Sequence, residues 1–179
     1  PSLYGAIREQ MDRLRALHID FAVCPGVSSF CGAAAALQAE YTLPNVSQTV
    51  IITRMAGRTP VPEKESIAQL AAHGATMVIF LSTGLLKELS KELQKGGYSA
   101  DTPAAIVYKA SWPDEKVIRC TVGTLAENAA KYGINKTALI TVGGFLGNAY
   151  DRSELYNPTF AHGFREADPT KLDVKPEVK

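Results

Sequence analysis

Two short segments carry residue types that could bind a ligand. The first is VCPGVSSF at residues 23–30, where Pro25 and Gly26 interrupt an apolar run. Ser28 and Ser29 then suit the start of a helix, where free N–H groups attract polar or anionic groups. Ligands often bind where the strands of an α/β sheet end, so this turn is a candidate ligand site. An ordinary strand-to-helix turn would explain the same residues.

The second segment is TRMAGRTP at residues 53–60, which is rich in glycine and proline and follows an apolar run. Arg54 and Arg58 flank a glycine turn in this segment. A guanidinium group can bind a carboxylate through two parallel hydrogen bonds, so the pair could hold a ligand that carries several carboxylates. The alternative is that both arginines are solvated residues of a loop.

Other motifs that carry chemistry are weak in this sequence. Neither GxSxG, nor HExxH, nor a Walker loop occurs, and GGFLG at residues 143–147 fits a strand-exit turn better than a phosphate loop. The three histidines, at positions 18, 73 and 162, have no partner at i, i+4, so we expect no protein-bound metal. We therefore assign no general base.

The composition excludes several classes of protein. The chain has 179 residues, 46% of them hydrophobic and 21% charged, with a net charge of +1 and no basic run, which disfavours a nucleic-acid partner. No apolar run approaches the roughly 20 residues of a membrane span. Cys24, Cys31 and Cys120 lack CxxC spacing, which indicates a reducing cytoplasm. Cys24 and Cys120 lie in apolar runs and are expected in the core.

Hydrophobic periodicity predicts an α/β fold with a mixed, mostly parallel five-stranded sheet and flanking helices. The expected helices cover residues 6–17, 28–37, 62–73, 82–96 and 124–132. The expected strands cover residues 21–24, 49–53, 76–81, 103–108, 116–121 and 137–142, with a hairpin between 103–108 and 116–121. Beyond residue 150 the prolines and charges predict a tail that is mobile from about residue 171.

Several segments together resemble the tetrapyrrole (corrin/porphyrin) methylase family. They are PSLYG at 1–5, VCPGVSSF at 23–30, LP at 43–44, TRMAGRTP at 53–60 and LYNPTFAHGFR at 155–165. The resemblance implies S-adenosylmethionine-dependent methylation of a corrin precursor at ring carbon 11, in cobalamin synthesis, with or without cobalt in the ring. It implies a cytoplasmic homodimer that binds a tetrapyrrole but neither nucleic acid nor a membrane.

The resemblance also implies roles for particular residues. The methyl donor would be held largely by main-chain groups and small side chains, and the matching positions are Leu3, Ser28, Ser29, Leu81, Ala110 and Ala138. The tetrapyrrole would contact Tyr4, Arg54 and Arg58.

The family pattern also predicts how the chain is divided. Residues 1–17 would be a connecting loop and helix from an N-terminal α/β domain that is missing here. Residues 18–147 would form the C-terminal methylase domain, and residues 148–179 a tail. Such a piece is expected to be inactive alone. The alternatives are a non-catalytic tetrapyrrole or nucleotide binding module, or a related methylase that acts on another ring carbon or on a protein or RNA.

Overall fold

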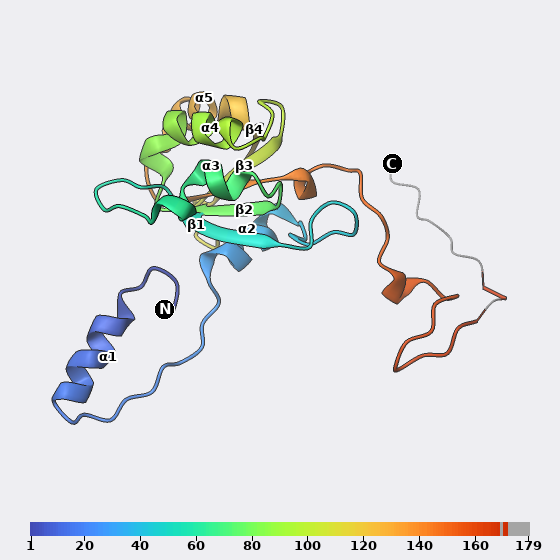
Figure 1. The fold of residues 1–179 in the computed structure, drawn as a ribbon, viewed down its shortest axis with the longest axis horizontal. Helices are drawn as coiled ribbons and strands as arrows, with labels where there is room; N and C mark the ends of the chain where they lie inside the picture. Colours follow the sequence, from blue (N-terminus) through green and yellow to red (C-terminus); the bar gives the residue numbers. More distant parts are fainter. Residues whose placement is uncertain (169, 172–179) are drawn as a thin grey trace.

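The computed structural model describes residues 1–168, 170 and 171, and its centre is a five-stranded sheet. The strands are β1 (Val50–Arg54), β2 (Thr76–Phe80), β3 (Pro103–Tyr108), β4 (Lys116–Thr121) and β5 (Ala138–Val142). They lie in the order β1-β2-β5-β3-β4. Figure 1 shows helices on both faces of this sheet, so the predicted five-stranded mixed sheet with flanking helices is confirmed.

The strand directions differ from the prediction. Only β1 and β2 pair in parallel, whereas β5 is antiparallel to β2 and β3, and β4 is antiparallel to β3. The expectation that parallel pairs would dominate is therefore wrong. Continuous apolar runs such as β2 and β5 indicate burial on both faces, and a central antiparallel strand covered by helices is buried in the same way. After the β3–β4 hairpin, α5 returns the chain to the other side of β3. Strand β5 therefore runs in the same direction as β4, and both are antiparallel to β3.

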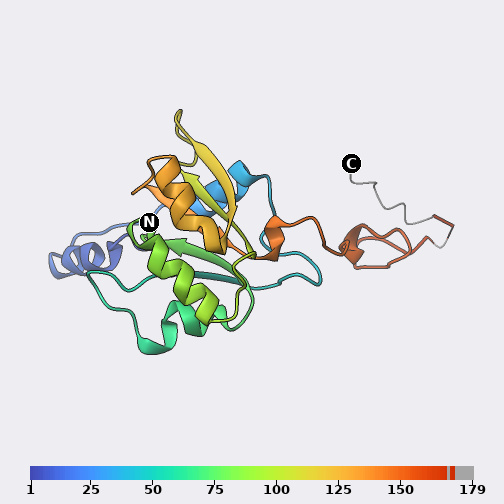
Figure 2. The same cartoon turned by 90° about the horizontal axis from the view of Figure 1, so that it is seen from above.

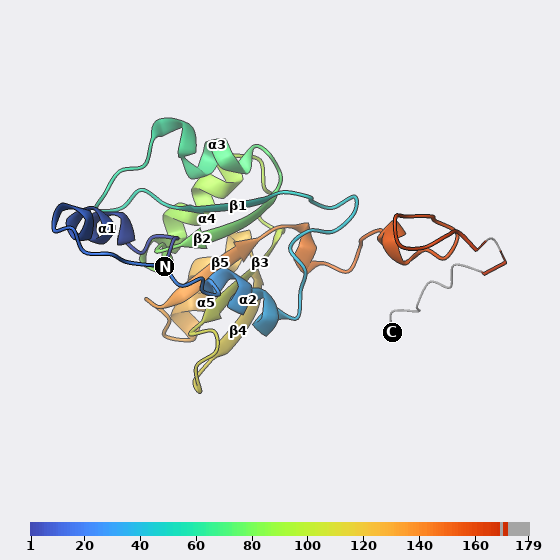
Figure 3. The same cartoon turned by 90° about the horizontal axis from the view of Figure 1, so that it is seen from below.

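Helices cover the two faces unequally. The helices are α1 (Ile7–Ala16), α2 (Ser29–Leu37), α3 (Ile67–Ala71), α4 (Leu86–Lys95) and α5 (Leu125–Lys131). On one face Met77 and Ile79 of β2 pack in a core with α3, α4 and α5. On the other face Val78 packs with Ala33 and Leu37 of α2. This alternation follows from the period of two along a strand, and Figures 2 and 3 show the two layers from opposite sides.

The helix predicted over 62–73 is shorter and broken. A 3₁₀ turn at Glu63–Glu65 precedes α3, and Ser66 between them has an extended backbone with ψ of 148°. Gly74 then ends the segment in the left-handed region with φ of 61°, as its C-cap position predicts.

The segment before α2 is not a strand. Residues 19–28 form an irregular connection that pairs with none of the strands, so the strand predicted at 21–24 is wrong and Cys24 is exposed rather than in the core. Phe21 and Val23 instead line a small hollow with α1, and the Arg15 guanidinium lies 5.3 Å from the centre of the Phe21 ring. Residues 19–27 are nevertheless all exposed and no residue of α1 is buried, so α1 does not replace the sheet neighbour that was expected. Cys120 is half-buried against the core, in line with its prediction.

The segment after β5 leaves the sheet as an extended arm, visible in Figures 1 to 3. The Arg165 guanidinium holds its turns together by donating to the carbonyls of Leu155 (3.1 Å), Phe160 (3.3 Å) and Asn157. The predicted mobile end lies on residues 172–179, outside the described residues. Within the described part, no helix is both long and apolar enough to cross a membrane.

Candidate functional site at one edge of the sheet

The predicted donor positions on the sheet meet at one edge. Strands β1, β2 and β3 end at this edge, and β5 begins there, because β5 runs antiparallel to β2 and β3. The β2–β5 pairing ends with Ile79 opposite Ile140, Leu81 directly follows β2, and the Thr83 Oγ1 donates to the Ala138 carbonyl over 3.1 Å. Tyr108 pairs with Ala138, and Ala110 follows two residues later. The topology therefore gathers three positions that are far apart in the sequence.

Backbone strain is concentrated at the same edge. Leu81, Lys109 and Thr137 have φ values of 52°, 47° and 56°, in the left-handed region that residues with a Cβ seldom adopt. The Lys109 N–H donates to the Thr137 carbonyl over 3.0 Å, which ties two of these residues together. Such conformations cluster at functional sites, where the surrounding structure holds them in place. None of the three is a glycine, so the sequence carried no signal for them.

Leu81 has an unusual environment for a leucine at the end of a buried strand. It is 72% exposed, whereas the two residues that follow it, Ser82 and Thr83, are 0% and 8% exposed. The chain thus turns an apolar side chain outward and two hydroxyls inward. This arrangement leaves Leu81 at the surface of the site, as a ligand-contacting residue requires.

A first hollow, here called the serine hollow, lies beside this edge. It is lined by Leu3, Phe80 and residues 23–31, and its volume is about 880 Å³, within the range of ligand sites. Ser28 takes the N-cap position of α2, as predicted, yet its side chain makes no capping hydrogen bond. Ser28 is half-buried and Ser29 is exposed. The two predicted serines therefore line a hollow whose far wall is the end of β2.

Ala110 lies beyond the end of β3 and packs beside the first turn of α2. It is half-buried, and a Cβ placed on Gly32 in the first turn of α2 would lie 3.6 Å from the Ala110 Cβ. The small residues at both positions keep α2 and the β3 exit close while leaving little bulk between them. The sequence analysis assigned Ala110 to donor binding, but it is not among the residues that line the serine hollow, so its role in donor binding stays a prediction.

A second hollow, here called the arginine hollow, lies on the β1 side. Its lining includes Arg54, Arg58, Leu81 and Leu85. The Arg54 guanidinium is half-buried and donates to the carbonyls of Met55 (3.1 Å), Thr59 (3.2 Å) and Pro60 (2.8 Å). Arg54 therefore shapes its own loop, a role that sequence reasoning missed. Because these acceptors are neutral, the bonds leave its positive charge in place.

Arg58 and Tyr4 complete this side. Arg58 is exposed, and neither Arg54 nor Arg58 forms an ion pair with any residue in the described part of the chain. The Tyr4 ring centre lies 5.3 Å from that of Phe80. Burial raises the pKa of the Tyr4 phenol, and Glu65 adds to the rise while the Arg54 charge opposes it. Tyr4 is thus a protonated hydroxyl near the arginine loop at neutral pH.

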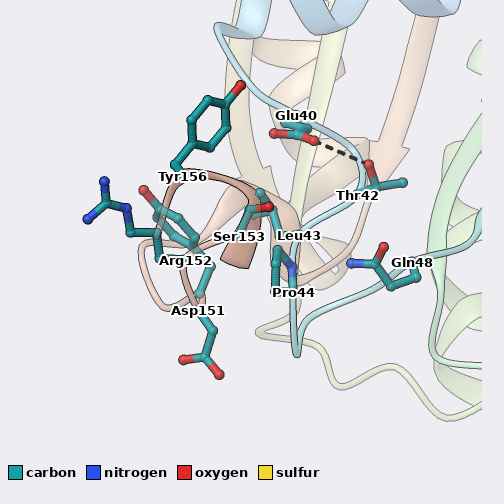
Figure 4. A pocket seen from close by; sticks show the side chains of 10 residues that line it. Glu40, Thr42, Leu43, Pro44, Gln48, Asp151, Arg152, Ser153 and Tyr156 are labelled. Atoms are coloured by element: carbon teal, nitrogen blue, oxygen red, sulfur yellow. Dashed lines mark hydrogen bonds between the residues drawn. The ribbon is translucent and has the colours of Figure 1, made fainter. Parts of the chain in front are cut away.

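A third hollow lies at the opposite edge of the sheet and contains none of the predicted residues (Figure 4). It is formed by residues 40–48 and 150–156, which are joined by the Asn45–Asp151 side-chain hydrogen bond and by the Asp151 N–H to the Pro44 carbonyl at 3.3 Å. Gly144 packs against Val46 on this side, so the glycine-rich turn after β5 is a strand exit remote from the site. Among the residues described, no group of His, Cys, Asp and Glu is arranged to hold a metal.

Comparison with known proteins agrees with this fold. The model of the tetrapyrrole (corrin/porphyrin) methylases matches residues 1–126, and the chain belongs to this family. The site is therefore built on the scaffold of a methylase.

Individual relatives are more specific. The chain is 52% identical over 168 residues to the cobalt-precorrin-4 C(11)-methyltransferase of Methanocaldococcus jannaschii, covering 93% of this chain and 65% of the relative. It is 43% identical over 169 residues to the precorrin-4 C(11)-methyltransferase of Pseudomonas aeruginosa, covering 94% and 67%.

A solved structure of a cobalt precorrin-4 methyltransferase, described as a cobalamin biosynthetic enzyme, superposes with a TM-score of 0.81 at 49% identity, covering 83% of this chain and 62% of that one. The chain thus spans about two thirds of the length of the relatives that it matches.

Proposed function

We propose that this chain is part of an S-adenosylmethionine-dependent methyltransferase that methylates ring carbon 11 of precorrin-4 or cobalt-precorrin-4 in cobalamin biosynthesis. The observation that carries the proposal is that Leu81, Ala110 and Ala138 lie at or just beyond the same ends of β2, β3 and β5, where Leu81 also lines the arginine hollow. The names of the relatives, and their sequence identity to this chain, support precorrin-4 or cobalt-precorrin-4 as the substrate.

The donor would lie along the strand ends and the serine hollow. S-adenosylmethionine supplies an already activated methyl group on its sulfonium. The protein would therefore contribute chiefly by aligning the reacting atoms and by excluding water. Leu3, Ser28, Ser29 and Leu81 would contact the donor, and the small side chains of Ala110 and Ala138 would leave room for its adenosine.

The tetrapyrrole would lie on the side of the arginine hollow. Its carboxylates would pair with Arg58, which is exposed, while Arg54 adds positive charge and shapes the loop. The Tyr4 hydroxyl, which like any tyrosine is protonated at neutral pH and whose pKa burial raises further, would donate a hydrogen bond to the same ligand. We assign no group as general base.

The assembly and location are part of the same proposal. We propose a homodimer, supported by the exposed aromatic side chains on the arm: Tyr150, Tyr156, Phe160 and Phe164. The three cysteines form no disulfide, which supports a reducing cytoplasm.

Both hollows are open to solvent, so we propose that these 179 residues alone bind the donor weakly and transfer no methyl group. As proposed domains, residues 1–17 connect to an N-terminal α/β domain, 18–147 form the methylase domain and 148–179 the tail.

The test is a titration and an assay with the full-length protein. S-adenosylhomocysteine should bind in a calorimeter, and transfer of a labelled methyl group should be seen with precorrin-4, cobalt-precorrin-4 or both. Binding of donor and tetrapyrrole without any turnover would instead indicate a binding module. Turnover with a product methylated at another ring carbon would correct the assigned position.

A further inference from the structure

Two consecutive buried hydroxyls join the Leu81 turn to the strands on either side of it. The Ser82 Oγ accepts the Met55 N–H over 3.0 Å and donates to the Phe80 carbonyl over 2.7 Å. This one atom therefore links the exit of β1 to the exit of β2. Ser82 is fully buried, so no water can replace the bond.

The next residue makes the corresponding link on the other side. The Thr83 Oγ1 donates to the Ala138 carbonyl over 3.1 Å, which joins the β2 exit to the start of β5. Thr83 is 8% exposed. Leu81 directly precedes both linking residues; it is left-handed and exposed, and it would not hold that conformation without support.

We infer that Ser82 and Thr83 are positioning residues with separate tasks, an inference that rests on the proposed function. Ser82 fixes the loop after β1, which carries Arg58 and the carbonyls that hold Arg54, relative to the Leu81 turn. Thr83 fixes the start of β5, where Ala138 lines the donor site. Ser82 thus positions the part of the site that would bind the tetrapyrrole, and Thr83 positions the part that would bind the donor.

The two tasks predict that neighbouring substitutions weaken the binding of different ligands. Ser82→Ala removes the acceptor of the Met55 N–H and should raise the KM for the tetrapyrrole about three- to tenfold, with little change in donor affinity. Thr83→Val keeps the shape but removes the hydroxyl, and should weaken S-adenosylhomocysteine binding by a similar factor. Thr83→Ser restores the hydroxyl and should bind the donor as the unmodified protein does.

The matched control is Ser90→Ala. Ser90 is also 8% exposed and its Oγ accepts a hydrogen bond from Gln94 Nε2 over 3.1 Å, but it lies within α4. Ser90→Ala should lower stability without changing the KM for the tetrapyrrole or the affinity for S-adenosylhomocysteine. If all three hydroxyl deletions weaken both ligands alike, the effect is general loss of stability and the inference is wrong.

Hydrogen exchange supplies a readout that does not depend on activity. In the full-length protein without ligand, Ser82→Ala should speed amide exchange in residues 55–60, Thr83→Val should speed it around residue 138, and Ser90→Ala should change neither. Unchanged exchange in both segments overturns the inference even if the enzyme is active. If the unmodified protein binds no S-adenosylhomocysteine, the proposed function fails and with it the predicted split between ligands. The exchange data still report separately whether the hydroxyls hold the turn.

Discussion

Leu81 allows a direct test of the strained strand exit. We compare Leu81→Ala with Leu81→Gly, because both remove the same exposed leucine side chain and differ only in the Cβ. A left-handed backbone costs a residue with a Cβ about 1–2 kcal/mol. Glycine avoids this cost but loses about 0.5–1 kcal/mol more conformational entropy on folding. With φ of 52° at this position, Leu81→Gly should therefore be about 0.5–1 kcal/mol more stable than Leu81→Ala.

The same pair of substitutions at Glu127 is the control. Glu127 is exposed inside α5, where glycine is less favourable than alanine by about 0.8–1 kcal/mol. Urea unfolding curves with equal slopes give the differences as shifts of the midpoint. The order of stability should be inverted between the two positions. If alanine is the more stable at both, Leu81 is not held in a left-handed conformation and the strain argument fails.

The binding of the donor should follow the opposite trend at position 81. A glycine makes the turn more flexible, and ordering a flexible turn on binding costs free energy. We therefore expect Leu81→Gly to bind S-adenosylhomocysteine more weakly than Leu81→Ala although it folds more stably. Equal affinities would place the donor away from the Leu81 backbone.

Three further predictions concern other positions. Ala110→Leu should abolish S-adenosylhomocysteine binding in calorimetry, and because Ala110 packs beside Gly32 of α2 it should also lower the free energy of unfolding by about 1–3 kcal/mol; unchanged donor affinity in the folded variant would remove Ala110 from the site. Arg58→Ala should raise the KM of the tetrapyrrole at least tenfold more than that of the donor, since about 1.4 kcal/mol of a lost carboxylate contact corresponds to tenfold; equal effects would indicate structural damage. Burial raises the pKa of the Cys120 thiol to about 11 from an unfolded value of 9.0, so its contribution to stability is present below pH 9 and is lost as the pH rises to 11. Cys120→Ala should lose less stability over that interval, and an identical loss in both proteins would contradict the assignment.

Local patterns in the sequence predicted most elements because their causes are local. The 3.6-residue period of Ile7, Met11 and Leu14 predicted α1, and the leucines at 86, 89 and 93 predicted α4. The turn residues between 103–108 and 116–121 predicted the hairpin of β3 and β4. The strand 21–24 failed because a strand exists only with a partner, and β-prone composition cannot show whether one is available.

Residue type and position alone singled out Ser28, Ser29, Arg54 and Arg58 as candidates. The other site residues depended on resemblance, since each of them alone fits an ordinary core or loop position. Their meeting at one edge depends on strand order and direction, which bring Leu81, Ala110 and Ala138 together across gaps in the sequence that no local rule spans. The same holds for the hydrogen bonds that Arg54 makes with its own loop.

The sequence by itself therefore determined most of the helical and extended segments, which side chains are apolar, and which family they match. Only the tertiary structure reveals the left-handed backbone at Leu81, Lys109 and Thr137 and the buried bonds of Ser82 and Thr83. The physical reason is that long-range contacts hold such conformations against their intrinsic cost, so residues without a local preference for a turn are found in one.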